Sequence, residues 1–431
     1  MRRFDWANIC RWMITIALGY VMFLPVGHNT ILLPSLGLIF AASLTLAIKG
    51  RRTIAGPAAI PILIVIAVGV YGSLIGISNP GVANGALVWI VAPILFGTWV
   101  WAGDKKLIRM VMFAAVIVTI LISVIAVAYV ALSMAGIRVP QWIVTQLELN
   151  YNGNSFGATA ITLYGLSTLV ATGPMWLTAS LLPQHPLLPK KPLVMVAGAL
   201  SLLVSLLAGR SALTVVAIVV PVGAWVVWRI YSRRLPRSLR MKIAPLGVVV
   251  VVIVGILGAA AVGTNGFTRA LKRLISVVTG TGQTISEKIR AEQSDQLVHA
   301  WFNSPIFGHG FGATIAGYSR EEARPWNFEL QYHLILFQVG LLGAVVLAIG
   351  VTFAILGLWR AVRMQPAMLA PVLVAAAGAA AMLVANASNP YLQAPGNMWP
   401  VYFVLMMLNV SLVPKRNAEG QEPSVPVAAI N

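Results

Sequence analysis

Long apolar segments alternate with short polar ones along most of the chain. A helix that crosses the hydrocarbon core of a membrane needs about 20 mostly apolar residues, so each such segment is a candidate span. The pattern predicts twelve spans, at residues 11–26, 30–48, 57–76, 83–102, 108–134, 155–181, 193–208, 212–231, 243–264, 331–359, 368–387 and 398–413. The sequence therefore predicts an all-α polytopic membrane protein, with a single transmembrane domain over residues 1–431.

The composition agrees with a membrane protein. Apolar residues make up 59% of the 431 positions and charged residues only 10%, whereas a soluble protein carries about 25% charged residues. A soluble enzyme and a disordered chain are both excluded. The net charge of +19 does not indicate a nucleic-acid partner, because the basic residues cluster between apolar segments. The single cysteine, Cys10, allows neither an intramolecular disulfide nor a cysteine metal site.

The placement of the basic residues predicts the orientation in the membrane. If the N-terminus is cytoplasmic, 21 of the 30 Lys and Arg residues fall on the cytoplasmic side. Cytoplasmic segments are typically the basic ones, so both termini are predicted to be cytoplasmic. Residues 414–431 are expected to form a disordered cytoplasmic tail. A cleaved signal peptide at the first apolar segment is a weaker alternative, because no small-residue cleavage pattern follows Val26.

A long polar segment, residues 265–330, separates the ninth and tenth predicted spans and is expected to be a periplasmic loop. Its residues 285–302 have a helical rhythm of apolar and polar positions. Gly308, Gly310 and Gly312 follow, and their spacing predicts a backbone that adopts positive φ and approaches another group closely. Loops of this length are usually functional, which favours a lid over a cavity for a lipid-linked or anionic substrate. A solvated cap without chemistry is the alternative.

Two arginines near the predicted outer edge of the membrane are candidate phosphate ligands. Arg210 lies at the tip of the tight turn Gly209–Ser211 between two spans, and Arg290 lies on the predicted loop helix. A guanidinium is permanently charged and forms two parallel hydrogen bonds with a phosphate. An interfacial anchor for Arg210 and a solvated position for Arg290 are the alternatives.

Glu329 and His333 are candidate proton acceptors. They are four residues apart at the start of the tenth predicted span, so they are expected on one helical face. Either one could take a proton from a sugar hydroxyl, and the alternative is a polar helix start that faces water. The other four histidines do not show a metal-ligand spacing, so no metal site and no cofactor are expected.

Amide and tyrosine side chains also follow the predicted outer ends of spans. The segments Asn150–Asn154 and Asn386–Gln393 are candidates to line a sugar-binding cavity. Tyr332, Asn389 and Tyr391 are the individual residues that we expect to bind a glycan. Ordinary turn chemistry is the alternative interpretation of these segments.

Together these residues resemble the O-antigen ligase and O-antigen polymerase superfamily of bacterial inner-membrane glycosyltransferases. Gly209–Ser211 resembles one arginine motif of that family, and the rest of the resemblance lies between Arg290 and Gly343. Its motifs follow the family's order and are Arg290, Ala300-Trp301, Ser304-Pro305, Gly308–Gly312, Glu329–Tyr332 and Gly340–Gly343.

The resemblance implies a metal-independent transferase in the bacterial inner membrane, with its active site facing the periplasm. Its donor would be a glycan on undecaprenyl diphosphate, its acceptor a glycan or lipid A core, and membrane lipids would surround it. Arg210 and Arg290 would bind the diphosphate. Ligases of this family typically place a histidine eleven residues before the first glycine of the Gly-x-x-Gly pair, where this chain has Glu329.

The departure at Glu329 favours a polymerase of O-antigen or exopolysaccharide repeat units over a ligase. Glu329 would then be the base, with His333 in reserve. A transporter of a lipid-linked solute is a rival from another class, and transporters commonly show inverted repeats and broken helices. The sequence shows neither of these clearly. A third alternative, a structural membrane subunit, predicts that Arg210, Arg290 and Glu329 lie far apart.

Overall fold

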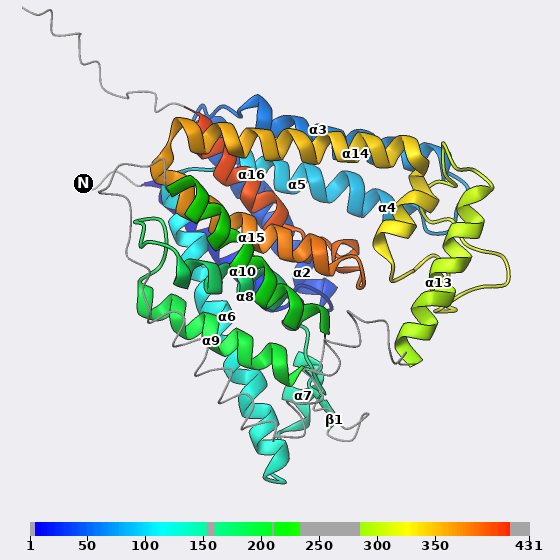
Figure 1. The fold of residues 1–431 in the computed structure, drawn as a ribbon, viewed down its shortest axis with the longest axis horizontal. Helices are drawn as coiled ribbons and strands as arrows, with labels where there is room; N and C mark the ends of the chain where they lie inside the picture. The colour runs from blue at the N-terminus through cyan, green and yellow to red at the C-terminus, as the bar shows by residue number, and fades with distance from the viewer. Residues whose placement is uncertain (1–4, 153–159, 209–210, 233–284, 414–431) are drawn as a thin grey trace, which may run out of the picture.

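The computed structural model describes residues 5–152, 160–208, 211–232 and 285–413, and most of them are helical. The long helices form a bundle with two distinct ends (Figure 1). One end carries the first residues of the N-terminal helix together with Asp104, and we call it the Asp104 end. The opposite end carries the separate helix α13, Ile285–Phe302, and we call it the α13 end (Figure 1).

Apolar helices account for most of the first 134 residues. They are α1 Trp6–Phe23, α2 Asn29–Lys49, α3 Gly56–Ile75, α4 Val82–Ala86, the π-helical turn η1 Leu87–Val91, α5 Ala92–Trp101 and α6 Lys105–Met134. Two of them begin at an aspartate that caps the helix. Asp5 accepts a hydrogen bond from the N–H of Asn8, and Asp104 accepts one from the N–H of Leu107. These caps fix where α1 and α6 begin, because they satisfy N–H groups that have no partner inside the helix.

The middle of the chain combines a small sheet with three helices. The elements are α7 Gln141–Leu147, β1 Asn150–Asn152, β2 Ala160–Thr162, α8 Leu166–Leu181, α9 Lys191–Leu207 and α10 Ser211–Ser232. The strands are antiparallel, with Tyr151 opposite Ile161. The predicted start of the sixth span at residue 155 is therefore wrong, since the helix begins at Leu166. Aromatic and β-branched residues favour an extended pair at this point.

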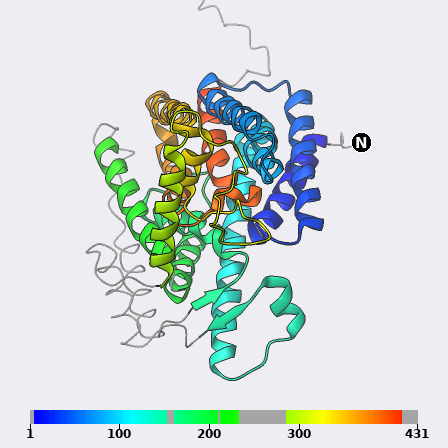
Figure 2. The same cartoon turned by 90° about the vertical axis from the view of Figure 1, so that its right-hand side faces the viewer.

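The last part of the chain contains α13 and the longest helix of the described residues. After α13 come α14 Gln331–Met364, η4 Pro366–Met368, α15 Leu369–Ala385, η5 Tyr391–Gln393, η6 Pro395–Asn397 and α16 Trp399–Leu412. The predicted loop helix and its end before residue 303 are confirmed by α13. Seen from the α13 end, α13 and the segment after it lie in front of the bundle (Figure 2).

Eight helices or continuous helical stretches in the described ranges are long and apolar enough to cross a membrane. Three further predicted spans correspond to the shorter helices α8, α9 and α16. The ninth predicted span, 243–264, and the tail 414–431 lie outside the described residues. Over its described ranges the chain is thus a helical membrane protein, with one two-stranded sheet besides the helices. The count of twelve spans and the orientation of the termini stay predictions.

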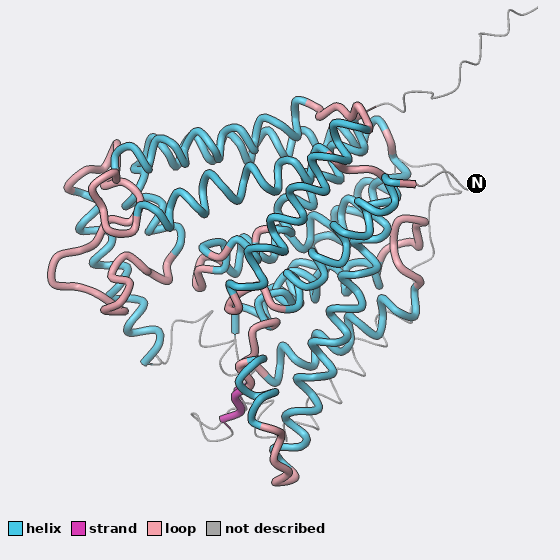
Figure 3. Tube along the Cα trace, turned by 180° about the vertical axis from the view of Figure 1, so that it is seen from behind, coloured by secondary structure: helices cyan, strands magenta, loops and turns pink. Residues whose placement is uncertain are grey.

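The core of the bundle is built around α8, whose residues 166–180 are all buried. Many of them are small, which lets neighbouring helices approach closely. Trp176 fills this core and donates its indole N–H to the hydroxyl of Thr119 on α6, at 2.8 Å. Conversely, the outer face of α14 exposes apolar residues such as Leu341 and Val345. The helices fill the body of the bundle while loops gather at its ends (Figure 3).

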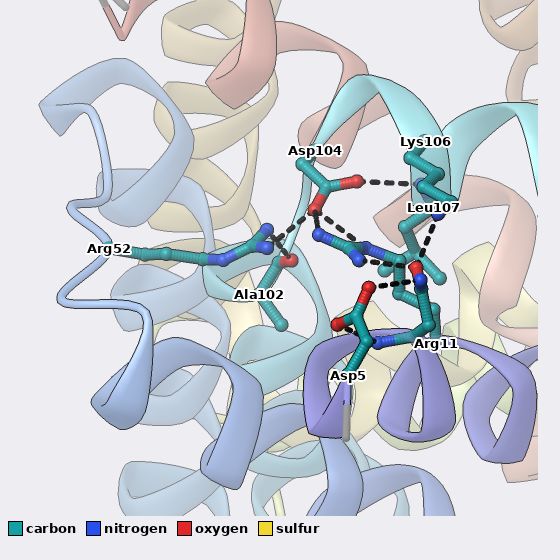
Figure 4. A network of polar contacts seen from close by, with 8 residues as sticks. Asp5, Arg11, Arg52, Ala102, Asp104, Lys106 and Leu107 are labelled. Carbon is teal, nitrogen blue, oxygen red and sulfur yellow. Dashed lines mark hydrogen bonds and ion pairs between the residues drawn. The ribbon is translucent and has the colours of Figure 1, made fainter. Parts of the chain in front are cut away.

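An ion-pair network ties three segments together at the Asp104 end (Figure 4). Arg11 of α1 donates to the Asp104 carboxylate from Nε at 3.0 Å and from Nη2 at 2.8 Å. Arg52, between α2 and α3, pairs with the same carboxylate oxygen and donates to the Ala102 carbonyl. Burial alone would raise the pKa of Asp104, but hydrogen bonds from Arg11 and Leu107 and the charge of Arg52 lower it overall.

We expect Asp104→Asn to lower the stability of the folded protein by about 2 kcal/mol, because two partly buried guanidiniums lose their counter-charge. Asparagine still caps a helix, so the loss reports the ion pairs and not the cap. A lowered pKa in the folded state stabilises the fold above the unfolded pKa of about 4, and this stabilisation is lost as the pH falls. Thermal denaturation in detergent should therefore show a difference between the two proteins that shrinks below pH of about 4.

The control for this experiment is Asp5→Asn, which makes the same change at the exposed cap of α1. It should shift the denaturation midpoint far less than Asp104→Asn. Equal shifts in the two variants would show that the ion pairs of Asp104 with Arg11 and Arg52 add no stability beyond that of one carboxylate at a helix N-terminus.

Candidate functional site

The helix α14 is interrupted nine residues after it begins, at Gly340. Gly340 has φ 62° and ψ −172°, a conformation open essentially to glycine alone. The segment that follows α13 fills this break with its own backbone. Two α14 carbonyls before the break and two α14 N–H groups after it bond to this segment; the pairs are His309 N to Phe337 O at 2.9 Å, Gly310 N to Gln338 O at 2.8 Å, Leu341 N to Pro305 O at 2.9 Å and Leu342 N to Ile306 O at 3.1 Å.

The three alternating glycines make this insertion possible. Gly308, Gly310 and Gly312 have φ of 75°, 81° and 73°, so the predicted positive φ is confirmed at all three. A Cβ on Gly310 would overlap the backbone of Gly76, at the end of α3, and one on Gly312 would overlap the backbone just before α4. The predicted close approach is thus confirmed as well, and it joins the segment to α3 and α4 as well as to α14.

Glu329 lies just before α14, not on it. The helix begins at Gln331 with Leu330 as its N-cap, so the prediction that Glu329 and His333 share a helical face is wrong. The position of Glu329 is set instead by α13. The side-chain oxygen of Gln293 accepts hydrogen bonds from the N–H groups of Glu329 and Leu330, at 3.0 and 3.1 Å. Because these two groups precede the first helical residue, no carbonyl of α14 is available to them.

An apolar cluster holds α13 against this junction. Leu297 of α13 is fully buried, and it packs with a set of apolar residues before and within the first half of α14, namely Phe328, Leu330, Leu334 and Phe337. The helical spacing from Arg290 through Gln293 to Leu297 places all three on the side of α13 that faces the junction. The same face of α13 therefore supplies Leu297 as an apolar contact, Gln293 as an acceptor for backbone N–H groups, and the positive charge of Arg290.

Two arginines meet the carboxylate of Glu329. Arg290 Nε lies 3.1 Å from Oε2, and Arg320 Nη1 contacts Oε1, so each oxygen has its own guanidinium. All three side chains are partly buried, with between 20% and 39% of each exposed. Burial, followed by the charge of Arg290, lowers the pKa of Arg320 from its ordinary value. The trio of Arg290, Arg320 and Glu329, which we call the arginine cluster, carries a net positive charge.

The structure brings together some of the predicted site residues and leaves others apart. Arg290 and Glu329 meet as expected. His333 lies on the first turn of α14 with Nε2 3.2 Å from the hydroxyl of Ser294, so it faces α13 one turn beyond Arg290. Arg210 lies outside the described residues, between the end of α9 and the start of α10.

The three predicted glycan ligands make their polar contacts away from the arginine cluster. The hydroxyl of Tyr332 donates to the Leu383 carbonyl of α15 at 2.7 Å, and the amide of Asn389 donates to the neighbouring Ser388 at 3.1 Å. Tyr391 is buried. Their role in binding a glycan stays a prediction. Across the part of the chain that the structure describes, no three His, Cys, Asp or Glu side chains gather to hold a metal ion.

Sequence reasoning missed two residues of the site. Arg320 reaches Glu329 from a loop, and no periodicity or spacing in the sequence links the two positions. Gln293 did leave a signal, because it lies three residues after Arg290 and four before Leu297, on one face of a predicted helix. A buried amide at such a position indicates a backbone group that needs a partner.

Comparison with protein families gives an independent result over this part of the chain. Residues 197–345 match the family model described as O-antigen ligase. This match confirms the resemblance to the O-antigen ligase and polymerase superfamily. It contains Arg210, α13, the arginine cluster and the break in α14. It supports a role in surface-polysaccharide assembly, as in the glycosyltransferase-like enzymes of the O-antigen ligase family. No curated protein matches the chain.

We expect Gly310→Ala to destabilise the site more than Gly317→Ala does, by roughly 1–3 kcal/mol. Both glycines have positive φ, at 81° and 73°, so the added methyl strains the backbone similarly in the two variants. Only at Gly310 would the new Cβ also overlap another backbone, since nothing lies within 4 Å of it at Gly317. Thermal denaturation and limited proteolysis after α13 measure the difference. Equal behaviour of the variants would mean that the contact with α3 is dispensable.

Proposed function

We propose that this chain is a glycosyltransferase of the bacterial inner membrane that polymerises O-antigen or exopolysaccharide repeat units at the periplasmic face. Its donor is a glycan on undecaprenyl diphosphate, and its acceptor is a second glycan. The observation that carries the proposal is the arginine cluster, in which two guanidiniums meet one carboxylate at the start of α14. This is the combination that a departing diphosphate and an attacking hydroxyl require.

The guanidiniums suit the leaving group. As the bond from the sugar to the diphosphate breaks, negative charge builds up on the diphosphate oxygens. Fixed cations lower the energy of that state more than the energy of the bound substrate, and this difference accelerates the reaction. In the proposal Arg290, Arg320 and Arg210 hold the diphosphate, and no metal ion is required for this role.

The carboxylate suits the acceptor. A carboxylate paired with two guanidiniums is stabilised in its ionised form. A bound diphosphate carries more negative charge than Glu329 and competes for the same guanidiniums, so donor binding loosens Glu329 from them. The released carboxylate becomes available as a general base. The base is thus set free when the donor is in place.

The proposed step balances as a single displacement. The acceptor hydroxyl oxygen forms a bond with the anomeric carbon of the donor sugar, and the bond from that carbon to the diphosphate oxygen breaks with its electron pair. The hydroxyl proton passes to Glu329, and undecaprenyl diphosphate leaves as an anion. His333 is the reserve base, because it lies near the same face of α13.

Two other functions remain as alternatives. A ligase would use the same donor chemistry and transfer the glycan to lipid A core. A transporter would bind the lipid-linked solute without making a bond, and the break in α14 is a feature that transporters share. The break lies only nine residues from one end of a 34-residue helix. The charged residues of the arginine cluster meet before the first residue of α14, at the end of the helix and not at the break, and this location favours a group-transfer site.

Product analysis tests the proposal directly. The purified full chain is reconstituted with lipid-linked repeat units, with and without lipid A core, and the products are sized. A ladder of lengths without lipid A core supports polymerisation. A single transfer to lipid A core would replace it by ligation, and no product with either acceptor would favour transport.

We expect Glu329→Gln to reduce polymer formation by about 100-fold or more, because an amide cannot accept the hydroxyl proton. Donor binding should persist or become tighter, since the guanidiniums lose an internal competitor. The measurement is product yield together with equilibrium binding of the lipid-linked donor. His333→Ala is made in parallel. Full activity in the Glu329 variant with loss in the His333 variant would transfer the base role to His333.

We expect Arg320→Lys to lower turnover about 10-fold or more at saturating donor, because an ammonium cannot reproduce the two parallel hydrogen bonds of a guanidinium. The matched control is Arg324→Lys, in the same loop, where Arg324 is exposed and pairs with Glu321. Initial rates of product formation compare the two variants. Wild-type turnover in Arg320→Lys would leave Arg320 as a partner of Glu329 with no part in the reaction.

A further inference from the structure

A small hollow lies next to the arginine cluster and is lined by uncharged groups. It lies between α4 and η1 on one side and the first half of α14 on the other, and the segment after α13 completes it. The enclosed part of the hollow holds only about 20 Å³, and the hollow together with its open mouth spans about 320 Å³. The residues that give it its chemistry are Asn84, Trp89, Trp326, Gln331, Gln338 and Gln393.

The amides of the hollow have unused hydrogen-bonding capacity. Gln338 is only 6% exposed, its amide makes no hydrogen bond with another described residue, and its amide atoms are not sealed from solvent. Gln331 is 1% exposed and uses its oxygen to accept from Gln393 at 2.9 Å. An amide that opens onto a hollow without a protein partner is free to donate to and accept from the hydroxyl of a ligand.

The indoles add apolar walls to the amides. Trp89 is stacked on Phe311, with ring centroids 5.5 Å apart and an angle of 13° between the planes. It lies on η1, and π-helical turns within α-helices are frequent at functional sites. The indole of Trp326 packs against Gly81, and a Cβ on residue 81 would overlap it. Two flat apolar surfaces beside several amides match a sugar ring, which has C–H faces and a rim of hydroxyls.

The hollow differs from the arginine cluster in that none of its lining residues is charged. None of its lining residues is an Asp, Glu, Lys, Arg or His, so it offers a phosphate no opposite charge. The charged groups lie immediately next to it. Gln331 follows Glu329 by two residues, which limits their Cα atoms to about 7 Å apart. Gln393 donates to the Phe328 carbonyl at 3.0 Å as well as to Gln331, so it holds both sides of the junction.

We propose that this hollow binds one sugar ring of the acceptor glycan and presents a hydroxyl of that sugar to Glu329. The proposal rests on the transferase function proposed above. It places acceptor recognition on Gln338, Gln331 and Trp326, next to the base, and leaves the diphosphate to the arginines. The enclosed part has room for one hydroxyl of that sugar, and the ring and the rest of the chain lie in the open mouth.

The first experiment measures binding without any reaction. The probe is a soluble oligosaccharide of two repeat units, released from its lipid by mild acid and added to the full chain in nanodiscs. Saturation-transfer NMR gives the dissociation constant. We expect Gln338→Leu to weaken binding about 5- to 10-fold and Trp326→Ala about 10-fold. The control is Trp142→Ala, because Trp142 is 70% exposed on α7 and does not line the hollow.

The second experiment separates acceptor from donor in the transfer reaction. With the same oligosaccharide as acceptor, the two hollow variants should raise the acceptor KM by the factors above and leave the donor KM unchanged. A change in the donor KM alone would overturn the assignment to the acceptor. A denaturation midpoint equal to that of the wild type shows that a variant is folded. Because two different variants are made, the test can still be done if one of them does not fold.

The outcomes distinguish this proposal from the proposed function. If wild-type protein forms polymer but neither hollow variant changes oligosaccharide binding or the acceptor KM, the hollow is not the acceptor site and the transferase function stands. If the oligosaccharide binds in the hollow but lipid-linked donor is never consumed, the transferase function fails and the sugar site stands. Absence of oligosaccharide binding to the wild type overturns the hollow as a sugar site.

Discussion

The break in α14 is the constraint on which the rest of the site depends. Backbone N–H and C=O groups in apolar surroundings must find partners, and an interrupted helix leaves several of them without one. Residues 305–310 supply those partners, and in doing so they bring the end of α13 and the loop against α14. The hollow borders this insertion through Gly312 and through Gln338, whose carbonyl accepts from Gly310. The arginine cluster lies at the other end of the same nine residues, at the start of α14.

The site divides its work between charged and uncharged groups. Arg290 and Arg320 form ion pairs with Glu329 just before α14 begins, and all three side chains are partly exposed. The amides lie along the first half of α14 and on neighbouring segments, where they are mostly buried. The proposed reaction has the same division, with the charged diphosphate of the donor at the arginines and an uncharged sugar of the acceptor at the amides.

Local patterns in the sequence predicted the local features. Apolar segments gave the long helices, the rhythm of 285–302 gave α13, and the alternating glycines gave the positive φ values. Features that depend on distant contacts were not predictable. Periodicity did not reveal that Glu329 precedes the helix, because its N–H is satisfied by Gln293, 36 residues earlier. Arg320 and the hollow arise only when loop, α4 and α14 meet in space.

The same break has a mechanical consequence. The second half of α14 exposes apolar side chains along its outer face, and a membrane helix tilts when the surrounding bilayer becomes thicker or thinner. A continuous helix would pass such a tilt directly to its far end. Here the helix is interrupted at Gly340, and the segment after α13 bonds to Phe337 and Gln338 before the break and to Leu341 and Leu342 after it. A tilt of the longer part therefore reaches the first nine residues through one glycine and this segment, and not through an unbroken helix.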